Sequence, residues 1–362
     1  MFNLNKESKI TFVRGAFLGD FLVCLPFIYK IISDYQINYK NISFLIFNNS
    51  GINPIKIIFG EDHQFSKNTT IVNTQNIFSL TNKSKINEIN KNSEIIYLPM
   101  WGDSFKGQIL KFLFLKYNYG ITKKIYGILK FDKKNNSTNS QYLIPFDLLG
   151  VQYDNTLSTI NIFDLEENND EKDGSLKISV YPNSKLKMKI WGKENYIVLL
   201  NKIIDIHNPT IYFIGGSEDK AYNDSIIIQL ENSYKVINLA GKSSVADTLG
   251  CLRRTDLFIG NDGFPMHLAA IANIPIVAIF SYKNPLGCWD PIISDRIITI
   301  RTDVSCKLCY LSECENPVCV TQTKVKDVFD SVETILSTKN NIHEIKVIFP
   351  NKILNKDTIS IS

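Results

Sequence analysis

The chain has 362 residues, of which 44% are hydrophobic and 21% are charged. This length and apolar content suffice for two packed domains, so we exclude a protein that is disordered as a whole. Lys and Arg number 40 against 36 Asp and Glu, and the net charge of +4 is too balanced for a dedicated nucleic-acid-binding protein. Apolar runs stay below the roughly 18 residues of a membrane span, and Arg14 and Asp20 interrupt the stretch 10–32. We therefore expect a cytoplasmic protein without a signal-peptide core.

The first part of the chain predicts a strand, a turn and a helix. Residues 9–14 are β-branched and aromatic, two glycines punctuate the turn, and residues 21–32 have helical apolar spacing. Residues 42–47 and 93–98 are predicted as further buried strands, with enough chain between the strands for helical crossovers. This alternation predicts a parallel α/β sheet.

A stretch without apolar residues, 166–174, divides the chain. Such a stretch is typical of a solvated linker, so we predict an N-terminal domain over 1–165 and a C-terminal domain over 175–338. After the linker, continuous apolar strands alternate with helices, which is typical of a parallel sheet covered on both faces. Ligands of such sheets bind beyond the carboxyl ends of the strands. The predicted strands are 176–181, 210–214, 235–239, 256–260 and 275–280, and the predicted helices are 195–206, 226–230, 245–252 and 267–272.

Residues 258–270, a strand that leads through a polar turn into a helix, form the most informative segment. The first N–H groups of a helix are unpaired and carry the positive end of its dipole, so a diphosphate can bind there without a metal. Asp262 would then accept a hydrogen bond from a sugar hydroxyl. The alternative is that Asp262 only caps the helix and that His267 is a core residue.

Together with other segments, this one resembles glycosyltransferase family 9, the heptosyltransferases that build the inner core of lipopolysaccharide from ADP-heptose. The resemblance covers nearly all of the second domain and the beginning of the first. It implies a GT-B fold, with two doubly wound Rossmann-like domains facing each other across a cleft, and an inverting transfer. The segments that carry it are 14–22, 214–219, 238–242, 261–270 and 276–280.

The resemblance implies roles for single residues. Asp20 matches the acidic residue of the family's Leu-Gly-Asp motif and is the expected general base, with a helix N-cap as its alternative role. Arg14 and Trp101 are candidate acceptor contacts, and catalysis is expected to need no cofactor. The candidate donor contacts are Ser184, Lys189, Gly215, Asp262, Gly263, Met266, His267, Leu268 and Lys283.

The sequence departs from the family pattern at three places. Gly263 and Phe264 replace a hydroxyl residue and a glycine, and a bulky side chain hinders close approach of a phosphate to the backbone. Lys283 replaces a threonine near the phosphates, and Asn183 replaces a glycine. These changes fit a different nucleotide sugar, another pose of the same one, or lost activity.

Four of the seven cysteines gather in residues 306–319, which we call the cysteine loop. Their spacing suits a tetrahedral thiolate site, so we predict a structural zinc or iron ion bound by Cys306, Cys309, Cys314 and Cys319. Many members of the resembled family carry a similar stretch. The alternatives are reduced thiols in an irregular loop and a reversible disulfide. Four thiolates leave no open position on the metal, so its role would be structural.

We therefore predict an inverting glycosyltransferase that moves a heptose, with ADP-heptose as the favoured donor, to a lipopolysaccharide core or other glycan or glycolipid acceptor. We expect it at the cytoplasmic face of the inner membrane, where lysines of a predicted helix over 108–119 are compatible with peripheral contact, although solvated lysines on a core-facing helix explain them as well. The tail 339–362 is expected to pack back on the N-terminal domain. The alternatives are transfer of another sugar, transfer to a protein, and a silent member that binds a nucleotide sugar or a partner transferase.

Overall fold

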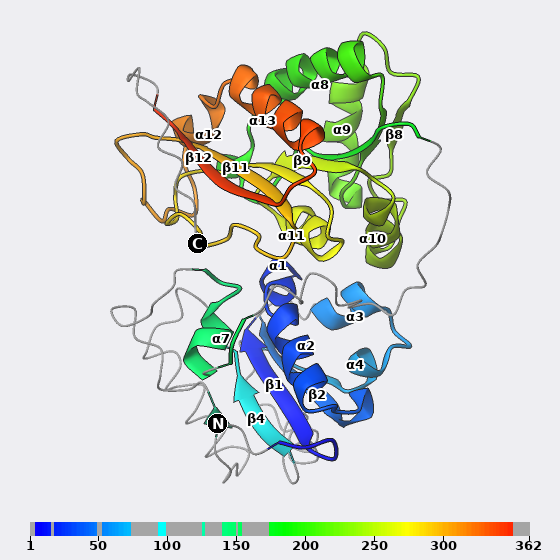
Figure 1. Cartoon of the computed structure of the whole chain (residues 1–362), viewed down its shortest axis with the longest axis vertical. Coiled ribbons are helices and arrows are strands. Elements are labelled where there is room, and N and C mark those ends of the chain that lie inside the picture. The colour runs from blue at the N-terminus through cyan, green and yellow to red at the C-terminus, as the bar shows by residue number, and fades with distance from the viewer. Residues whose placement is uncertain are drawn as a thin grey trace. The chain divides into compact units, whose positions relative to one another are not determined.

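The computed structural model describes residues 4–15, 18–48, 53–73, 93–98, 125–126, 140–149, 151–153 and 174–349. The chain divides into two compact units, Met1–Phe163 and Asp164–Ser362. Each unit contains one parallel β-sheet with helices packed against it (Figure 1). Within the described part of the chain, no helix is both long enough and apolar enough to cross a membrane.

The sheet of the first unit has five strands, all parallel to their neighbours. They are β1 (Lys9–Gly15), β2 (Ile42–Asn48), β3 (Thr69–Asn73), β4 (Ser93–Tyr97) and β5 (Ile125–Tyr126). Their order is β3-β2-β1-β4-β5, so β1 is central and pairs Ile10 with both Ile42 and Glu94. The strand order reverses between β1 and β4, and ligands of doubly wound sheets bind at such a reversal.

Short helices accompany this sheet. They are α1 (Leu18–Leu22), α2 (Leu25–Asp34), η1 (Tyr39–Asn41), α3 (Pro54–Phe59), α4 (Gln64–Lys67) and α7 (Ile144–Leu149). The helix predicted over 21–32 is thus divided between α1 and α2. Pro26 explains the division, because it has no N–H to continue α1 and is tolerated in the first turn of α2.

The sheet of the second unit has seven parallel strands. They are β6 (Lys177–Tyr181), β7 (Thr210–Phe213), β8 (Val236–Asn238), β9 (Leu257–Asn261), β10 (Ile276–Ile279), β11 (Arg296–Thr302) and β12 (Ile342–Ile348). Their order is β12-β11-β10-β9-β6-β7-β8, and the reversal lies between β6 and β9. Every residue of β9 and β10 is buried, as expected for central strands covered on both faces.

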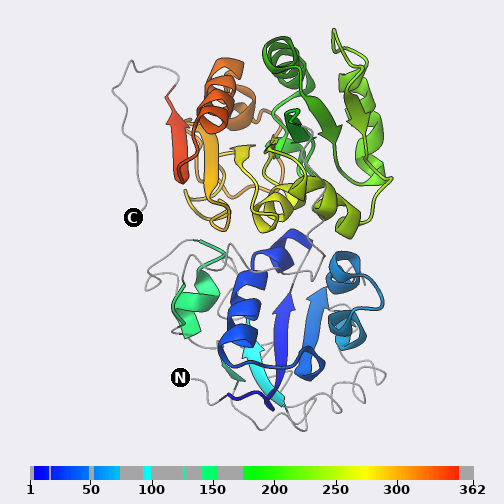
Figure 2. The same ribbon diagram turned by 45° about the vertical axis from the view of Figure 1, so that its right-hand side comes forward.

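Helices cover both faces of the second sheet. They are η3 (Lys187–Lys189), α8 (Lys193–His207), η4 (Ser217–Asp219), α9 (Lys220–Ile227), α10 (Val245–Arg253), α11 (Phe264–Ile271), α12 (Val318–Thr321) and α13 (Val325–Ser337). α8 and α13 pack together on one face, while α10 and α11 lie together on the other (Figures 1 and 2). The chain begins α10 with a capping box between Ser244 and Asp247.

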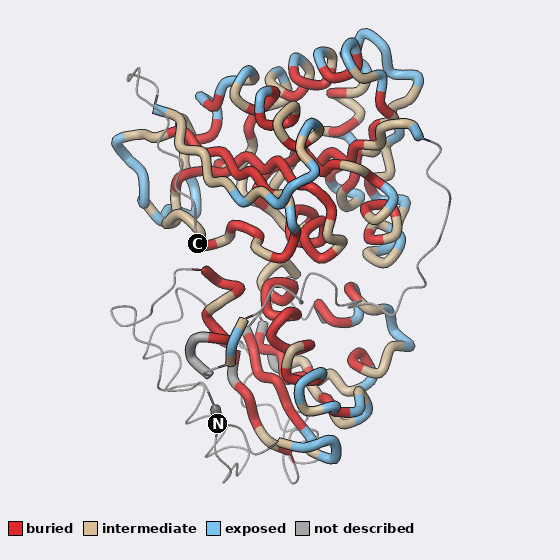
Figure 3. Tube along the Cα trace, viewed as in Figure 1, coloured by how far each residue is buried: buried red, intermediate tan, exposed pale blue. Residues whose placement is uncertain are grey.

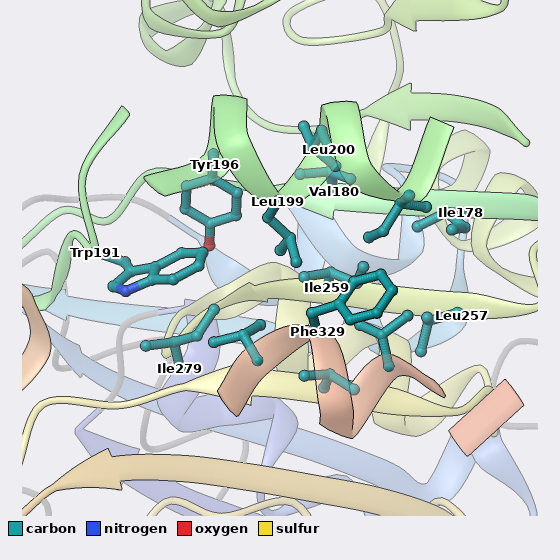
Figure 4. Packing of buried hydrophobic residues seen from close by; sticks show 14 of the residues in the cluster. Ile178, Val180, Trp191, Tyr196, Leu199, Leu200, Leu257, Ile259, Ile279 and Phe329 are labelled. Atoms are coloured by element: carbon teal, nitrogen blue, oxygen red, sulfur yellow. The ribbon is translucent and has the colours of Figure 1, made fainter. Parts of the chain in front are cut away.

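The core of the second unit fills the space between its sheet and the pair α8 and α13. Burial is continuous along the central strands, while the helices expose their outer sides (Figure 3). Trp191 and Tyr196 pack edge to face, with ring centroids 5.1 Å apart (Figure 4). The Trp191 indole also donates a 2.7 Å hydrogen bond to the Thr323 carbonyl, so the segment after η3 is fixed to the segment before α13.

The C-terminal segment differs from the expectation. We expect residues 339–362 to return to the N-terminal domain, but Ile342–Ile348 forms β12 and pairs in parallel with β11 of the second sheet. His343, Glu344 and Lys346 interrupt the apolar residues of this segment, and this mixed pattern suits a half-buried edge strand. Residues 350–362, and the predicted linker 166–174 except for its last residue, lie outside the described residues.

Candidate functional site

Lys189 and Asp262 form an ion pair where the strand order of the second sheet reverses. Asp262 directly follows β9, and Lys189 is the last residue of η3, in the connection between β6 and α8. The Lys189 Nζ and Asp262 Oδ2 atoms are 2.6 Å apart. Both side chains are largely buried, with exposed fractions of 15% and 5%. The N-cap of α11 is Gly263, without a side-chain cap, so Asp262 does not have the capping role considered above. Its carboxylate instead holds the Lys189 ammonium at the carboxyl edge of the sheet.

The loop after β6 is fixed by its own polar side chains. Asn183 donates a hydrogen bond to the Asp219 carboxylate and accepts one of 2.9 Å from the Ser184 N–H. Asp219 also accepts the Gly216 N–H at 2.9 Å, and burial raises the pKa of its carboxyl group. Gly215 has φ +147°, and a Cβ there would lie 2.5 Å from Asp219 Oδ2, so this position requires glycine. Asn183, a departure from the family pattern, therefore ties the loops after β6 and β7 together.

The packing around Gly263 explains why glycine stands at this position. A Cβ at this position would lie 3.0 Å from Cε1 of Tyr181, the last residue of β6, so the tyrosine ring leaves little room for a larger residue. The Ser184 hydroxyl donates a weak 3.5 Å hydrogen bond to the Asp262 carbonyl on the other side of the turn. The following Phe264 is half-buried at the start of α11. The turn is thus packed from the side of β6.

Lys283 brings a second positive charge to this edge of the sheet. It lies in the loop after β10, beside β9, and is half-buried. Burial lowers the pKa of its ammonium group, and the nearby Lys189 ammonium lowers it further, while Cys309 and Asp262 act in the opposite direction. Lys189, Asp262 and Lys283 therefore form one electrostatic group, although they come from three separate loops.

The helix residues predicted to contact the donor have buried side chains. Met266 and Leu268 are fully buried, and His267 is 3% exposed. The N–H groups of Met266 and His267 both donate to the Gly263 carbonyl, at 3.1 and 3.4 Å. Only backbone groups before Met266 are left to contact a ligand in this turn, and Pro265 offers no N–H. For His267 the structure agrees with the core alternative.

The burial of His267 predicts that the stability of the protein is sensitive to acid. Burial lowers its pKa from 6.5 to about 4, and Lys189 lowers it too, whereas Asp262 and Asp290 raise it. Between these two pH values the unfolded chain binds a proton that the folded chain does not, so stability falls as the pH decreases from 6.5 toward 4. We expect the free energy of unfolding to decrease by about 2 kcal/mol from this group between pH 7 and pH 5.

Urea denaturation at the two pH values measures this decrease. The matched variant is His267→Gln, which has a neutral side chain at both pH values and should lose about 2 kcal/mol less than the parent chain. An equal loss in the two proteins would show that His267 does not cause the acid sensitivity.

A buried ionic cluster beside this site is absent from the sequence prediction. Arg301, on β11, donates to Asp290 through both terminal nitrogens, at 2.7 and 2.6 Å, and the Thr299 hydroxyl donates to the same carboxylate at 2.6 Å. The Arg301 guanidinium also stacks on the Phe280 ring, 4.2 Å from its centroid. The side chains of the ion pair are only 2% and 6% exposed. Asp290 lies in the same loop as Lys283, between β10 and β11, so the cluster anchors that loop to β11.

The cysteine loop does not have the geometry predicted for it. Within the described residues, no group of three or more His, Cys, Asp or Glu side chains is placed to hold a metal ion. Cys306 is exposed and Cys319 is buried, while all four thiols are free. Burial raises the pKa of Cys319, and the other three cysteines raise it as well, so they lie near it. The arrangement does not fit the predicted zinc or iron site.

In the first unit, Asp20 lies in the first turn of α1, just after the central strand β1, and is half-buried. It is the third residue of that helix and so not its N-cap. Arg14, at the end of β1, is buried and donates to the Leu98 carbonyl at 3.3 Å. Burial raises the pKa of Cys24 to about 12, Arg14 lowers it and Asp20 raises it, so the three groups are neighbours. Trp101 and the predicted helix 108–119 lie outside the described residues.

Comparisons with known proteins identify the family. The model of glycosyltransferase family 9 (heptosyltransferase) matches residues 136–319, which is just over half of the chain. Lipooligosaccharide heptosyltransferase 2 of Campylobacter jejuni is 25% identical over 154 residues, which are 42% of this chain and 48% of that protein. The chain thus spans about half the length of the curated relatives it matches.

Solved structures confirm the predicted fold class. A family 9 glycosyl transferase from Veillonella parvula has a TM-score of 0.64 and 16% identity, covering 92% of this chain and 98% of its own. The E. coli heptosyltransferase WaaC, solved with ADP-2-deoxy-2-fluoro heptose, has a TM-score of 0.56 and 13% identity, covering 90% and 99%. The described sheets and these likenesses establish a GT-B fold with two Rossmann-like domains.

Proposed function

Because the chain belongs to glycosyltransferase family 9, we propose that it transfers a heptose from ADP-heptose to a lipopolysaccharide core or a related glycan acceptor. The observation that carries this proposal is the Lys189–Asp262 pair, which lies beyond the carboxyl ends of β6 and β9. A nucleotide binds at this reversal of strand order in Rossmann-like sheets. The similarity to WaaC, which was solved with an ADP-heptose analogue, supports an ADP-linked donor.

The chemistry of the donor side follows from the charges that gather there. Asp262 balances one of the two ammonium groups, so Lys189 and Lys283 together supply an excess positive charge to a diphosphate. This charge stabilises the nucleoside diphosphate as the bond to the sugar breaks and the electron pair leaves with it. The Ser184 hydroxyl lies beside the pair and is placed to donate to a phosphate oxygen.

On the acceptor side, we assign the proton transfer to Asp20. In an inverting reaction, the acceptor hydroxyl attacks the anomeric carbon from the face opposite the diphosphate, and a base removes the hydroxyl proton. Asp20 follows the strand β1 beside the reversal of strand order in the first sheet, where a carboxylate can meet a ligand. The proposed acceptor is a glycan or glycolipid at the cytoplasmic face of the inner membrane.

A thermal-shift experiment with ADP, GDP, UDP and CDP tests the donor. A ligand at 100 times its dissociation constant should stabilise the folded protein by about 2.7 kcal/mol, so ADP should raise the melting temperature and the other three should not. Selectivity for another nucleotide would keep a transferase but exclude ADP-heptose. Binding of ADP without release of ADP from ADP-heptose, in the presence of acceptor glycans, would instead support a silent binding protein.

Two lysine variants show whether the shift arises at the proposed site. Lys189→Met removes the paired ammonium and should abolish the ADP shift, whereas Lys185→Met alters an exposed lysine of the same loop and should preserve it. Each variant is compared with its own melting temperature without ligand, because loss of the buried pair also lowers stability. An unchanged ADP shift in Lys189→Met would place the nucleotide elsewhere.

A further inference from the structure

The cysteine loop is attached to the segment that carries Lys283. The Leu308 N–H donates a 2.8 Å hydrogen bond to the Tyr282 carbonyl, and the Tyr310 N–H donates one of 3.2 Å to the Lys283 carbonyl. The Tyr282 N–H donates in turn to the Cys319 sulfur. Residues from both ends of the cysteine loop therefore contact two consecutive residues after β10, one of which is Lys283.

The two donating residues have an unusual backbone conformation. Leu308 has φ +59° and Tyr310 has φ +56°, in the left-handed region that residues with a Cβ rarely adopt. Their side chains are 41% and 49% exposed, so side-chain packing alone does not explain this conformation. In this conformation both N–H groups donate to the segment after β10, and these two hydrogen bonds help to offset the cost of the positive φ angles.

The segment 280–290, which carries Lys283, is held at both of its ends. At one end, the Phe280 N–H donates to the Ile300 carbonyl at 2.9 Å. At the other, Asp290 is bound by Arg301 through the buried ion pair described above. Between these anchors, the cysteine loop supplies the contacts at Tyr282 and Lys283 themselves. The backbone at Lys283 is therefore held by the cysteine loop, between two anchors to β11.

We propose that the cysteine loop positions Lys283 for the diphosphate of the donor, through the backbone hydrogen bonds of Leu308 and Tyr310. Leu308 and Tyr310 are positioning residues in this proposal, and their side chains need not touch the ligand. The inference rests on the proposed function, because the diphosphate is that of the proposed donor. It gives a function to the hydrogen bonds between the cysteine loop and the segment that carries Lys283, in a loop whose described thiols do not form a metal site.

The test uses two substitutions that differ in their tolerance of positive φ. Tyr310→Val introduces a β-branched residue that disfavours this conformation, whereas Tyr310→Asn removes the same ring but tolerates it. Leu308→Val and Leu308→Asn form a second pair. Hydrogen exchange of residues 281–286 in the ligand-free protein is the first measurement. We expect about fivefold to tenfold faster exchange in the valine variants and little change in the asparagine variants.

The second measurement is the dissociation constant of ADP. Loss of one well-placed charge contact should weaken ADP binding about tenfold in Tyr310→Val, with Tyr310→Asn close to the parent chain. In a Lys283→Met background, Tyr310→Val should have little further effect, because both changes remove the same contact. If Tyr310→Val acted only by disturbing the fold, it would weaken ADP binding equally in the parent chain and in Lys283→Met.

The outcomes separate this inference from the proposed function. Equal exchange of residues 281–286 in the valine and asparagine variants would overturn the inference, whether or not ADP binds. Faster exchange in the valine variants, together with a parent chain that binds no ADP, would overturn the proposed donor and keep the attachment of Lys283 to the cysteine loop. An additive effect of Tyr310→Val and Lys283→Met would overturn the positioning of Lys283.

Discussion

Replacing Asp20 by asparagine should lower the rate of heptose transfer by about 10²- to 10⁴-fold, the usual contribution of a general base. Asparagine keeps the size of the side chain but cannot accept the proton of the acceptor hydroxyl. Asp20 lies in the first unit, whereas the donor residues lie in the second, so the dissociation constant of ADP should stay the same. The measurements are kcat with ADP-heptose and acceptor, and ADP binding by titration calorimetry.

Asp34→Asn is the matched control for this prediction. Asp34 ends α2 in the same unit, and its partly exposed side chain pairs with Lys30 at 2.7 Å. A surface pair of this kind contributes little, so kcat should remain within about twofold of the parent chain. Retention of the full transfer rate in Asp20→Asn would require another base.

Replacing Arg301 by methionine should lower the free energy of unfolding of the second unit by about 3 to 5 kcal/mol. The reason is that Asp290 would keep a buried negative charge and lose both hydrogen bonds from the guanidinium. Among the described residues, the 2.6 Å hydrogen bond from Thr299 is the one that would remain on that carboxylate. Combining Arg301→Met with Asp290→Asn should recover part of the loss, since no unpaired charge is then buried.

Tryptophan fluorescence during urea denaturation can measure this loss in the second unit alone. The chain has three tryptophans, and in a Trp101→Phe background the remaining Trp191 and Trp289 both report on the second unit. The control is Lys326→Met, which breaks an exposed pair with Asp330 on α13 and should cost less than about 1 kcal/mol. Equal losses in Arg301→Met and Lys326→Met would contradict a stabilising role of the buried cluster.

The sequence predicts the central strands of the second unit well, because these strands are uniformly apolar. β9 and β10 lie within one or two residues of their predicted ranges. The strands β11 and β12 are absent from the prediction, because charged residues interrupt them. Arg301 breaks the apolar run of β11, although the folded chain buries it against Asp290. A buried charge cannot be distinguished from an exposed one by hydrophobic pattern alone.

The candidate site shows the same limit. Lys189 and Asp262 are each selected from a loop after a strand, but their pairing depends on the adjacency of β6 and β9, which are far apart in the sequence. Asn183 looks like a loss of a glycine until the structure shows its hydrogen bonds to Asp219 and Ser184. The spacing of the cysteines suggests a metal site, whereas the backbone directs part of their loop toward Tyr282 and Lys283. The spacing of residues in the sequence limits which side chains can come into contact, but it does not determine which of these contacts form.

The edge strand β12 also affects the tendency of the protein to associate with other chains through the edge of its second sheet. Six of the seven residues of β11 are buried, so without β12 this strand would present its unpaired backbone to any other chain. Such edges promote sheet-to-sheet aggregation. β12 is half-buried throughout most of its length and carries His343, Glu344 and Lys346, which disfavour further pairing. The last described strand thus closes the sheet with a charged border and protects the folded protein from association through β11.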